Sequence, residues 1–232
     1  GGGIRLDRIN GQDVASNNNS NAWFSVDLFN NIIVNNVAGL AGGGISIQDA
    51  VKVNILHNTI ANNDSLGTAG QAFTNPNQST PQPGAGIATH SHSGTLVATG
   101  KPIGNFSDPL LDDTIVWHNR KFFFRIEQGT PGDPNTDPGT WGLCPDIGGT
   151  IANLACPGGN EPVYDDLGVI GAAGPFVCDG ACIDSNGSDP LFVNEYFNGN
   201  RSSIFQDEVI TIQTPAAFDE GGNFIQPRFG PL

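Results

Sequence analysis

The chain has 232 residues and a formal net charge of −14. Because nucleic acids and anionic membranes repel a strongly acidic protein, we expect neither as a partner. No stretch approaches the roughly 18 apolar residues of a membrane-spanning helix, so we expect no membrane span. With 32 glycines, 16 prolines and only 14% charged residues, the composition disfavours long helices. It favours short strands joined by tight turns.

A glycine-rich strand motif opens the chain and returns twice. It reads Gly-Gly-Gly-Ile-Arg-Leu at residues 1–6, Gly-Gly-Gly-Ile-Ser-Ile at 42–47 and Gly-Ala-Gly-Ile-Ala-Thr at 84–89. Each copy has the alternation of a strand with one buried face. We therefore expect three related strands here.

A second segment, residues 26–36, is repeated 27 residues later at 53–63, with five of 11 positions identical. A weaker copy at 110–119 follows 55 residues further on, which is about two more periods. Repetition at a fixed spacing predicts stacked coils of a solenoid, whose fold alone does not define a function.

The repeated segments predict both a core and its corners. Inward-facing positions are Val26, Leu28, Ile33, Ile45, Ile47, Val53, Ile55, Ile60, Ile115 and Val116. Asparagines end the strands at 30–31, 35–36, 58 and 62–63. Since Asn tolerates left-handed backbone and stacked Asn side chains hydrogen-bond to one another, we expect Asn ladders at the corners.

The later part of the chain is less regular. We divide the whole into coils at 1–125 with a loop at 64–83, a Pro/Gly/Cys-rich insertion at 126–188, and a terminal coil and tail at 189–232. We expect little regular structure in the insertion, and strands again at 189–193 and 210–212. Since a solenoid end exposes strand edges, we expect the chain to continue into a longer parent protein.

All four cysteines lie in the insertion, with no histidine near them in sequence. A zinc site of four cysteines needs two short pairs, and only Cys178 and Cys182 form one. We therefore predict the disulfides Cys144–Cys156 and Cys178–Cys182. They indicate an oxidising compartment, so we expect a secreted, periplasmic or cell-surface protein.

Four segments together resemble right-handed parallel β-helix repeat proteins of the pectate-lyase-like superfamily. They are the Gly-Gly-Gly-Ile strands, Asn-Thr-Ile-Ala-Asn-Asn at 58–63, Asp-Thr-Ile-Val-Trp-His-Asn at 113–119 and Asp-Pro-Leu-Phe-Val at 189–193. The resemblance covers about residues 1–125 and 186–215. It implies an all-β fold, a right-handed parallel β-helix solenoid with a long disulfide-tied loop insertion. The superfamily contains polysaccharide lyases, glycosidases, esterases, adhesins and catalytically silent scaffolds.

The resemblance to its enzymes directs attention to paired carboxylates. Lyases of this fold hold calcium with carboxylates beside an Arg or Lys, and hydrolases often use an Asp-Asp pair. Asp112-Asp113 and Asp165-Asp166 are such pairs. Adjacent strand residues face opposite ways, which suits a corner better than shared chemistry. We therefore assign no catalytic residue and keep Asp112 and Asp113 as the candidates for an enzyme.

The four histidines suit a transition metal. His90 and His92 share one face of the expected strand, about 6.5–7 Å apart at the backbone, and imidazole binds copper and zinc. His57 and His118 lie in the other two strand motifs. The repeat alignment places His57 opposite Asp112, so convergence of all four is not required by the pattern.

A calcium site is the other metal hypothesis. Asp184, Asn186 and Asp189 place oxygens at alternate positions around a glycine, as in a short calcium-binding turn without the bidentate glutamate of an EF-hand. Calcium is thus the first candidate cofactor, and copper or zinc the second.

These observations predict a secreted or cell-surface β-helix module with a structural or binding role and no catalysis of its own. One alternative is a carbohydrate-active enzyme, either a polysaccharide lyase or a glycosidase. Another is an extracellular copper- or zinc-binding protein. The expected partners are the rest of a longer parent chain or further subunits at the open solenoid ends, and a polysaccharide.

Overall fold

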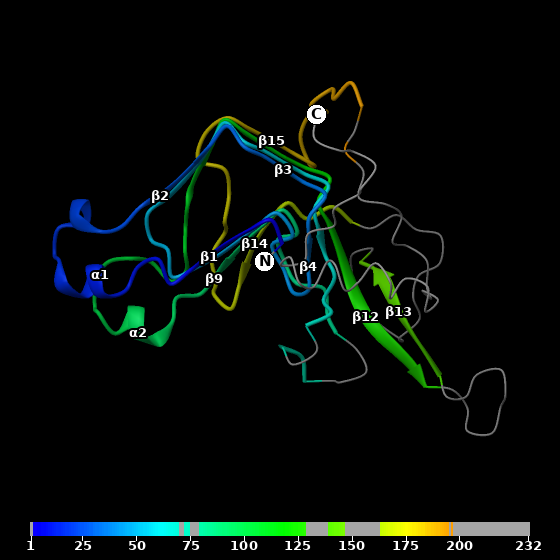
Figure 1. The fold of residues 1–232 in the computed structure, drawn as a ribbon, viewed down its shortest axis with the longest axis horizontal. Helices are drawn as coiled ribbons and strands as arrows, with labels where there is room; N and C mark the ends of the chain where they lie inside the picture. Colours follow the sequence, from blue (N-terminus) through cyan, green and yellow to red (C-terminus); the bar gives the residue numbers. More distant parts are fainter. Residues whose placement is uncertain are drawn as a thin grey trace.

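The computed structural model describes residues 2–69, 72–74, 79–128, 139–146, 163–194 and 196. Short β-strands dominate these residues, with two short α-helices and one 3-10 helix beside them (Figure 1). In this part of the chain no helix is long and apolar enough to cross a membrane. The fold class is all-β, as the composition and the repeats predicted.

The strands form four sheets, which we number I to IV. Their strand orders are β1-β5-β9-β14 in sheet I, β10-β6-β2 in sheet II, β15-β11-β7-β3 in sheet III and β13-β12-β8-β4 in sheet IV. The chain passes through sheets I, II, III and IV in that order three times, and then through sheets I and III again. We call each passage a rung.

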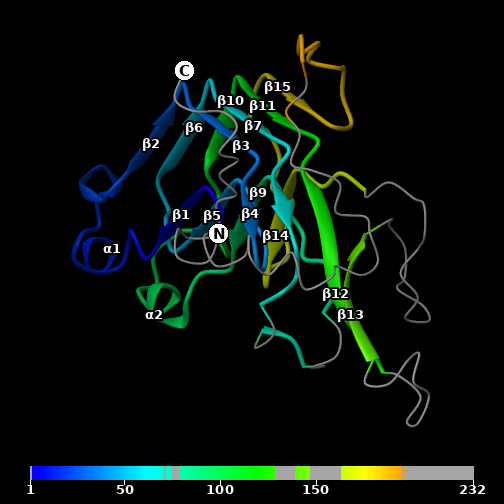
Figure 2. The same cartoon turned by 45° about the vertical axis from the view of Figure 1, so that its right-hand side comes forward.

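The first rung contains β1 (Ile4–Asp7), α1 (Gln12–Ser16), the 3-10 helix η1 (Ser20–Ala22), β2 (Val26–Phe29), β3 (Ile32–Val34) and β4 (Val37–Ala38). The second contains β5 (Ile45–Gln48), β6 (Val53–Leu56), β7 (Thr59–Ala61) and β8 (Asp64–Ser65). The third contains β9 (Ile87–His90), α2 (Gly94–Val97), β10 (Leu110–Asp112), β11 (Thr114–Trp117) and β12 (Arg120–Gln128). After β13 (Gly139–Pro145), the fourth contains β14 (Leu167–Ile170) and β15 (Cys182–Asp184). Figure 2 shows α1 and α2 on one side of the strands and the β12–β13 hairpin on the other.

Strands of neighbouring rungs pair in parallel, whereas β12 and β13 pair antiparallel. The 27-residue repeat sets the register, because Val26 lies opposite Val53 and Ile33 opposite Ile60. The glycine-rich motifs also stack on one another, as β1, β5 and β9. Mostly parallel strands in stacked sheets are compatible with a parallel β-helix.

The third copy of the repeat is adjacent to the second, which corrects the predicted spacing. Leu111 lies opposite Ile55 and Val116 opposite Ile60, a separation of 56 residues. These 56 residues therefore span a single rung, whereas the repeat spacing predicted about two periods. The additional length lies in segments 66–86 and 91–109, outside the paired strands.

Two corners of the rung have constant length. Sheets II and III are joined through positions 30–31, 57–58 and 113–114, and sheets III and IV through 35–36, 62–63 and 118–119. The first residue of each pair has positive φ: Asn30, His57, Asp113, Asn35, Asn62 and His118. By contrast, sheets I and II are joined by segments of very different length, 8–25, 49–52 and 91–109.

The second residue of each corner forms the predicted hydrogen-bonded rows. One row runs through the corner residues Asn36, Asn63 and Asn119 and ends on Asp166, the residue before β14, with side-chain bonds of 3.0, 2.9 and 2.8 Å. The other begins with Asn31 and Asn58, joined at 3.0 Å, and continues to Thr114 Oγ1, which accepts from the Asn58 N–H. Buried amide groups thus bond to neighbouring rungs rather than to water.

The core lies between the sheets and contains most of the predicted residues. Ile45, Ile55, Ile60 and Val116 have no exposed surface, and Ile33, Ile47 and Val53 are also buried, while Val26 and Leu28 are partly buried against them. Ile115 is the exception. It is adjacent to Val116 in β11, and only one of two successive strand residues can face inward.

The segments expected to be irregular contain regular structure. The predicted loop 64–83 begins with β8, and the predicted insertion 126–188 contains β13, β14 and β15, two of which join the parallel sheets. Residues 189–193, predicted as a strand, form none, and Leu191 and Val193 are 80% and 98% exposed. The strand predicted at 210–212 lies outside the described residues.

Candidate binding site

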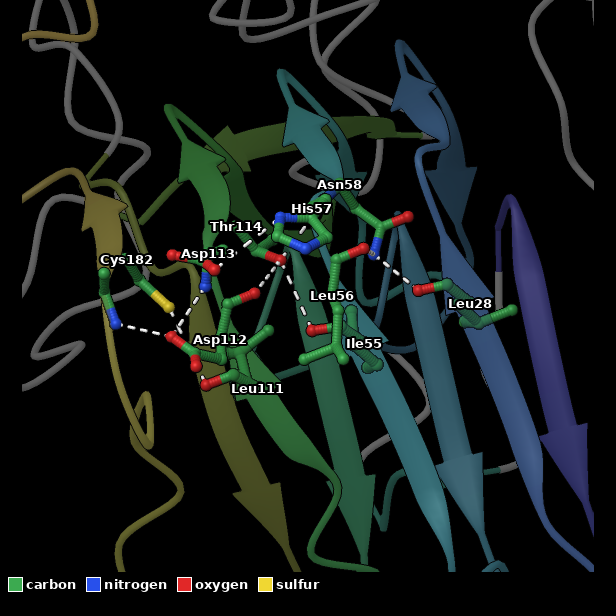
Figure 3. Close-up of polar contacts among 11 residues, drawn as sticks. Leu28, Ile55, Leu56, His57, Asn58, Leu111, Asp112, Asp113, Thr114 and Cys182 are labelled. Carbon is green, nitrogen blue, oxygen red and sulfur yellow. Dashed lines mark hydrogen bonds and ion pairs between the residues drawn. The ribbon is translucent and has the colours of Figure 1, made fainter.

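The corner between sheets II and III brings His57 and Asp113 together. Both have positive φ, and His57 Nδ1 is 3.7 Å from Asp113 Oδ2 (Figure 3). The predicted alignment of His57 with Asp112 is wrong by one residue, because Leu56 occupies the place opposite Asp112. Both side chains of the His57–Asp113 pair are more than half exposed, so water screens their interaction.

The carboxylates of Asp112 and Asp113 have separate partners. Asp112 Oδ1 accepts the N–H groups of Asp113 at 2.8 Å and Ala181 at 2.6 Å. It therefore closes its own corner and fixes the segment before β15. Asp113 instead points to His57 (Figure 3). None of these contacts joins the two carboxylates to each other.

His118 is part of an aromatic stack at the next corner. Its ring lies 4.4 Å from the Trp117 ring and 4.0 Å from the Tyr164 ring, both nearly parallel to it. The backbone N–H of His118 donates to Ser185 Oγ at 2.8 Å. Positive φ and ring stacking thus account for His118 at this corner.

His90 and His92 contact different residues. Strand β9 ends at His90, whose Nε2 lies 3.3 Å from Ser46 Oγ. Burial and then the positive charge of Arg5 lower the pKa of His90. The His92 side chain is fully buried, with Nδ1 3.4 Å from Asp49 Oδ1 and Nε2 3.3 Å from the Ile103 carbonyl. Among the described residues, no three His, Cys, Asp or Glu side chains form a group that could hold a metal ion.

The predicted calcium-binding residues form hydrogen-bonded turns. Asp184 Oδ1 accepts the Asn186 N–H at 2.9 Å, and Asp189 Oδ1 accepts the Leu191 N–H at 2.8 Å. These are bonds of aspartate residues to the backbone two residues on. Each carboxylate keeps one further oxygen, and Asp189 lies apart from the cavity that Asp184 and Asn186 line.

That cavity lies in the fourth rung and has a volume of about 250 Å³. Its polar lining combines Tyr164, Asp165, Asp166, Asp184 and Asn186. It brings together two of the three predicted calcium-binding residues and the second Asp-Asp pair. The volume lies below the roughly 300–1,000 Å³ of ordinary small-molecule sites. Only a small group, or one end of a larger ligand, fits there.

Asp166 supplies the most buried carboxylate of the cavity. Burial raises its pKa, against the opposing effect of hydrogen bonds from Ser185 and Asn119. Asp166 Oδ1 accepts from Asn119 Nδ2 at 2.8 Å, and Oδ2 accepts from the Ser185 N–H at 2.7 Å. This carboxylate therefore ends the Asn row and also holds the residue that follows β15.

Asp165, beside it, faces Lys121. Lys121 Nζ lies 2.7 Å from Asp165 Oδ2 and 3.2 Å from Asp146 Oδ2. Burial disfavours the charge of Lys121, but the two carboxylates outweigh it and raise the pKa of the amine. The Lys121 ammonium thereby joins the end of the β12–β13 hairpin to the start of the fourth rung.

A disulfide adjoins the cavity. Cys178 and Cys182 are bonded, as predicted, and Cys178 lines the cavity. Cys144 also takes part in a disulfide. Its predicted partner, Cys156, lies outside the described residues.

Sequence reasoning missed Tyr164 and Lys121. Neither belongs to a repeated motif, so no periodic signal placed them beside the fourth rung. The only cue was the position of Lys121 directly after Arg120, whose guanidinium makes a bidentate, buried pair with Asp64 at 2.8 Å. Strand alternation then turns Lys121 to the opposite side.

Comparison with known proteins leaves the family open. The chain matches no protein-family model, no curated protein and no solved structure. The site must therefore be interpreted from its own geometry: a small acidic cavity lined by two aromatic residues, Tyr164 and Phe176, at the end of a row of asparagines.

Proposed function

We propose that the chain is a right-handed parallel β-helix of the pectate-lyase-like type. In this proposal it serves a secreted or cell-surface protein as a structural or binding module, without catalysis of its own. The observation that carries the proposal is the row Asn36, Asn63, Asn119 and Asp166, which joins four rungs through side-chain bonds. Its three asparagines require the same corner to recur at the same place in three successive rungs, as a solenoid provides. Asp166, just before β14, takes the place of a fourth asparagine in the row.

Strand direction supports the right-handed sense. Apart from β13, each strand joins its sheet in parallel after the chain has passed through other sheets. Crossovers between parallel strands of one sheet are right-handed in about 98% of cases.

The roles of the predicted catalytic and metal-binding residues support a structural assignment. His57, Asp113 and His118 occupy corners with positive φ, where Asn, Asp and His are enriched. Asp112 and Asp184 accept backbone N–H groups. Most of these side chains thus have a structural explanation that requires no substrate.

A binding role is supported by the cavity of the fourth rung. Tyr164 is 39% exposed there, and its ring has an apolar face and a polar tip. The neighbouring carboxylates of Asp165 and Asp184 can accept hydrogen bonds from hydroxyl groups. This chemistry fits one end of a polysaccharide. Calcium would bridge the acidic lining to an anionic sugar, because its ligands are oxygens.

The test compares binding with cleavage. The chain is incubated with neutral and acidic polysaccharides, with and without calcium, while unsaturated ultraviolet-absorbing ends, reducing sugar and binding are measured. We expect binding without either product, and weaker binding by Tyr164→Ala. Cleavage that disappears in Asp112→Asn or Asp113→Asn would establish the enzyme alternative and overturn the proposal.

A further inference from the structure

The hydrogen bonds at the II–III corner have a direction. Asn58 Oδ1 accepts two hydrogen bonds from Asn31 in the preceding rung. The backbone N–H of Asn31 donates at 2.9 Å and its side-chain Nδ2 at 3.0 Å. Asn58 Nδ2 donates to the Leu28 carbonyl, again in the preceding rung, at 2.8 Å. The same direction holds at the III–IV corner, where Asn63 Oδ1 accepts from Asn36. Each ladder oxygen is therefore paired with a donor of the rung before it.

Asn31 is the first member of its row. Its Nδ2 donates to the Phe29 carbonyl at 3.1 Å and to Asn58 Oδ1. Within the described residues, no donor reaches Asn31 Oδ1. The equivalent atom of the next rung, Asn58 Oδ1, accepts two hydrogen bonds. An acceptor without a partner thus lies at the edge of the first rung, at the position where a preceding rung would supply two donors.

The core is also open at this edge. Ile4, Val26 and Leu28 are only partly buried, whereas Ile45, Val53 and Ile55, opposite them in the second rung, are 0%, 3% and 0% exposed. Strands β2 and β3 are each the last strand of their sheet among the described residues. Such an edge presents unpaired N–H and C=O groups.

The open corner is also flanked by large apolar side chains. Phe29 is 46% exposed and Ile32 is 66% exposed. These two residues precede and follow Asn30 and Asn31. A segment lying along β2 and β3 would cover apolar surface as well as pair the backbone.

We propose that the edge of β2 and β3 binds a further rung, a polypeptide segment with two strands parallel to β2 and β3 and an asparagine corner above Asn31. The partner is thus a strand–Asn–strand segment that donates its corner N–H and side-chain NH₂ to Asn31 Oδ1. Parallel register is required because only it repeats the corner-over-corner stacking of Asn31 on Asn58. The inference rests on the proposed structural role of the module and specifies the chemistry of its partner.

The probe is a labelled synthetic peptide with the sequence of residues 53–65, whose corner residue is Asn58. Binding to the full chain is followed by fluorescence anisotropy, and amide hydrogen exchange locates the bound peptide. We expect slower exchange in β2 and β3 and unchanged exchange in β15. A peptide with Asn58→Ala loses one side-chain donor and should bind roughly five- to tenfold more weakly, the effect of about 1 kcal/mol.

Variants of the chain isolate the acceptor oxygen. Asn31→Ala removes it, together with the side-chain donor to Asn58 Oδ1, and should weaken binding about tenfold. Asn31→Asp loses the same donor but keeps an acceptor, so it should bind more tightly than Asn31→Ala does. Asn21→Ala, an exposed residue outside the strands, is the matched control, and circular dichroism checks that each variant is folded. Equal binding of both peptides, or protection of strands other than β2 and β3, would overturn the inference.

Sedimentation distinguishes a second copy as the occupant. Association of the chain with itself that Asn31→Ala abolishes would replace the proposed segment by another subunit and overturn the choice of partner. Polysaccharide cleavage would refute the proposed function but leave the peptide results unaffected, so the two failures can be told apart.

Discussion

At the scale of the residue, backbone conformation explains the histidine pattern better than metal chemistry does. The Asn-rich corners could be predicted because Asn both tolerates positive φ and bonds to its neighbours. His57 and His118 stand at the same corners, in columns otherwise filled by Asn and Asp. From the sequence alone a histidine in a repeat has several explanations, and only the backbone angles and ring partners select among them.

Two His–Asp pairs in this chain differ mainly in burial and give a matched prediction. His92 and Asp49 have side chains 0% and 3% exposed. His92→Ala removes a buried ring and its polar contact with Asp49 Oδ1, which still accepts the Ser93 N–H at 2.8 Å. We expect a loss of about 2–5 kcal/mol in the free energy of unfolding, from the cavity and the lost polar contact together. His57→Ala, at the exposed pair with Asp113, should cost less than about 1 kcal/mol.

Urea denaturation of both variants measures the difference. His92→Phe fills the space without restoring the interaction with Asp49, so it should remain destabilised. If His92→Phe were as stable as the wild type, packing rather than the polar contact would explain the effect.

Asp166 gives a prediction about pH. Burial raises the pKa of its carboxyl above the ordinary value of 3.8, so the folded chain keeps this proton to higher pH than the unfolded chain. The folded state then binds more protons, and the free energy of unfolding falls as pH rises from that value through the raised pKa.

The measurement is the stability of wild type and Asp166→Asn from about pH 3 to about pH 7, a range that spans carboxyl titration. We expect the stability of the wild type, relative to the variant, to decrease as pH rises. A constant or increasing difference would show that the hydrogen bonds from Ser185 and Asn119 outweigh the effect of burial on the pKa of Asp166.

At the scale of the element, the repeats predicted the parallel strands but not every spacing. The first two copies have identical length, and their register was predicted correctly. The third was misaligned by one residue because inserted segments lengthen its rung without leaving a repeated signal. β14 and β15 went unpredicted because Gly168 and Cys182 interrupt the aliphatic and Asn pattern. The cavity, which depends on those strands, could not be predicted either.

Ile60 and Ile32 test which strand face forms the core. Ile60 is 0% exposed and Ile32 is 66% exposed, although they lie in adjacent strands, β7 and β3. Ile60→Ala should lower the free energy of unfolding by roughly 2–5 kcal/mol because it creates a cavity. Ile32→Ala should change it by no more than about 0.5 kcal/mol. Similar losses for both, measured by urea denaturation, would contradict the inside-to-outside alternation of these strands.

At the scale of the whole molecule, charge and composition argue against some classes of partner but identify none. The acidic balance disfavours nucleic acid, and the cysteines favour export, but neither identifies a ligand. The predicted fold class follows from backbone physics that every rung repeats. A site depends instead on single residues such as Tyr164, which occur once and leave no periodic trace.

Export makes a prediction about the whole set of thiols. If the chain matures in an oxidising compartment, both predicted disulfides form and no cysteine remains reactive. Thiol labelling of the unfolded, unreduced chain should therefore detect none, while reduction should release all four cysteines. Labelling of even one cysteine before reduction would contradict the predicted pairing of Cys144 with Cys156.

The corners of constant length fix the strand register, whatever the length of the connections between sheets I and II. The molecule can therefore serve as a scaffold that displays inserted sequences. The II–III and III–IV corners fix the alignment of every rung, while the connections between sheets I and II range from the short segment 49–52 to the long segment 91–109. A foreign sequence inserted between Val51 and Lys52, beyond the buried residues Asp49 and Ala50, would extend outward in the same way as its natural neighbours. Several insertions on successive rungs would then be held about one strand spacing apart, roughly 4.8 Å. They would form a regularly spaced row of epitopes on one face of the molecule.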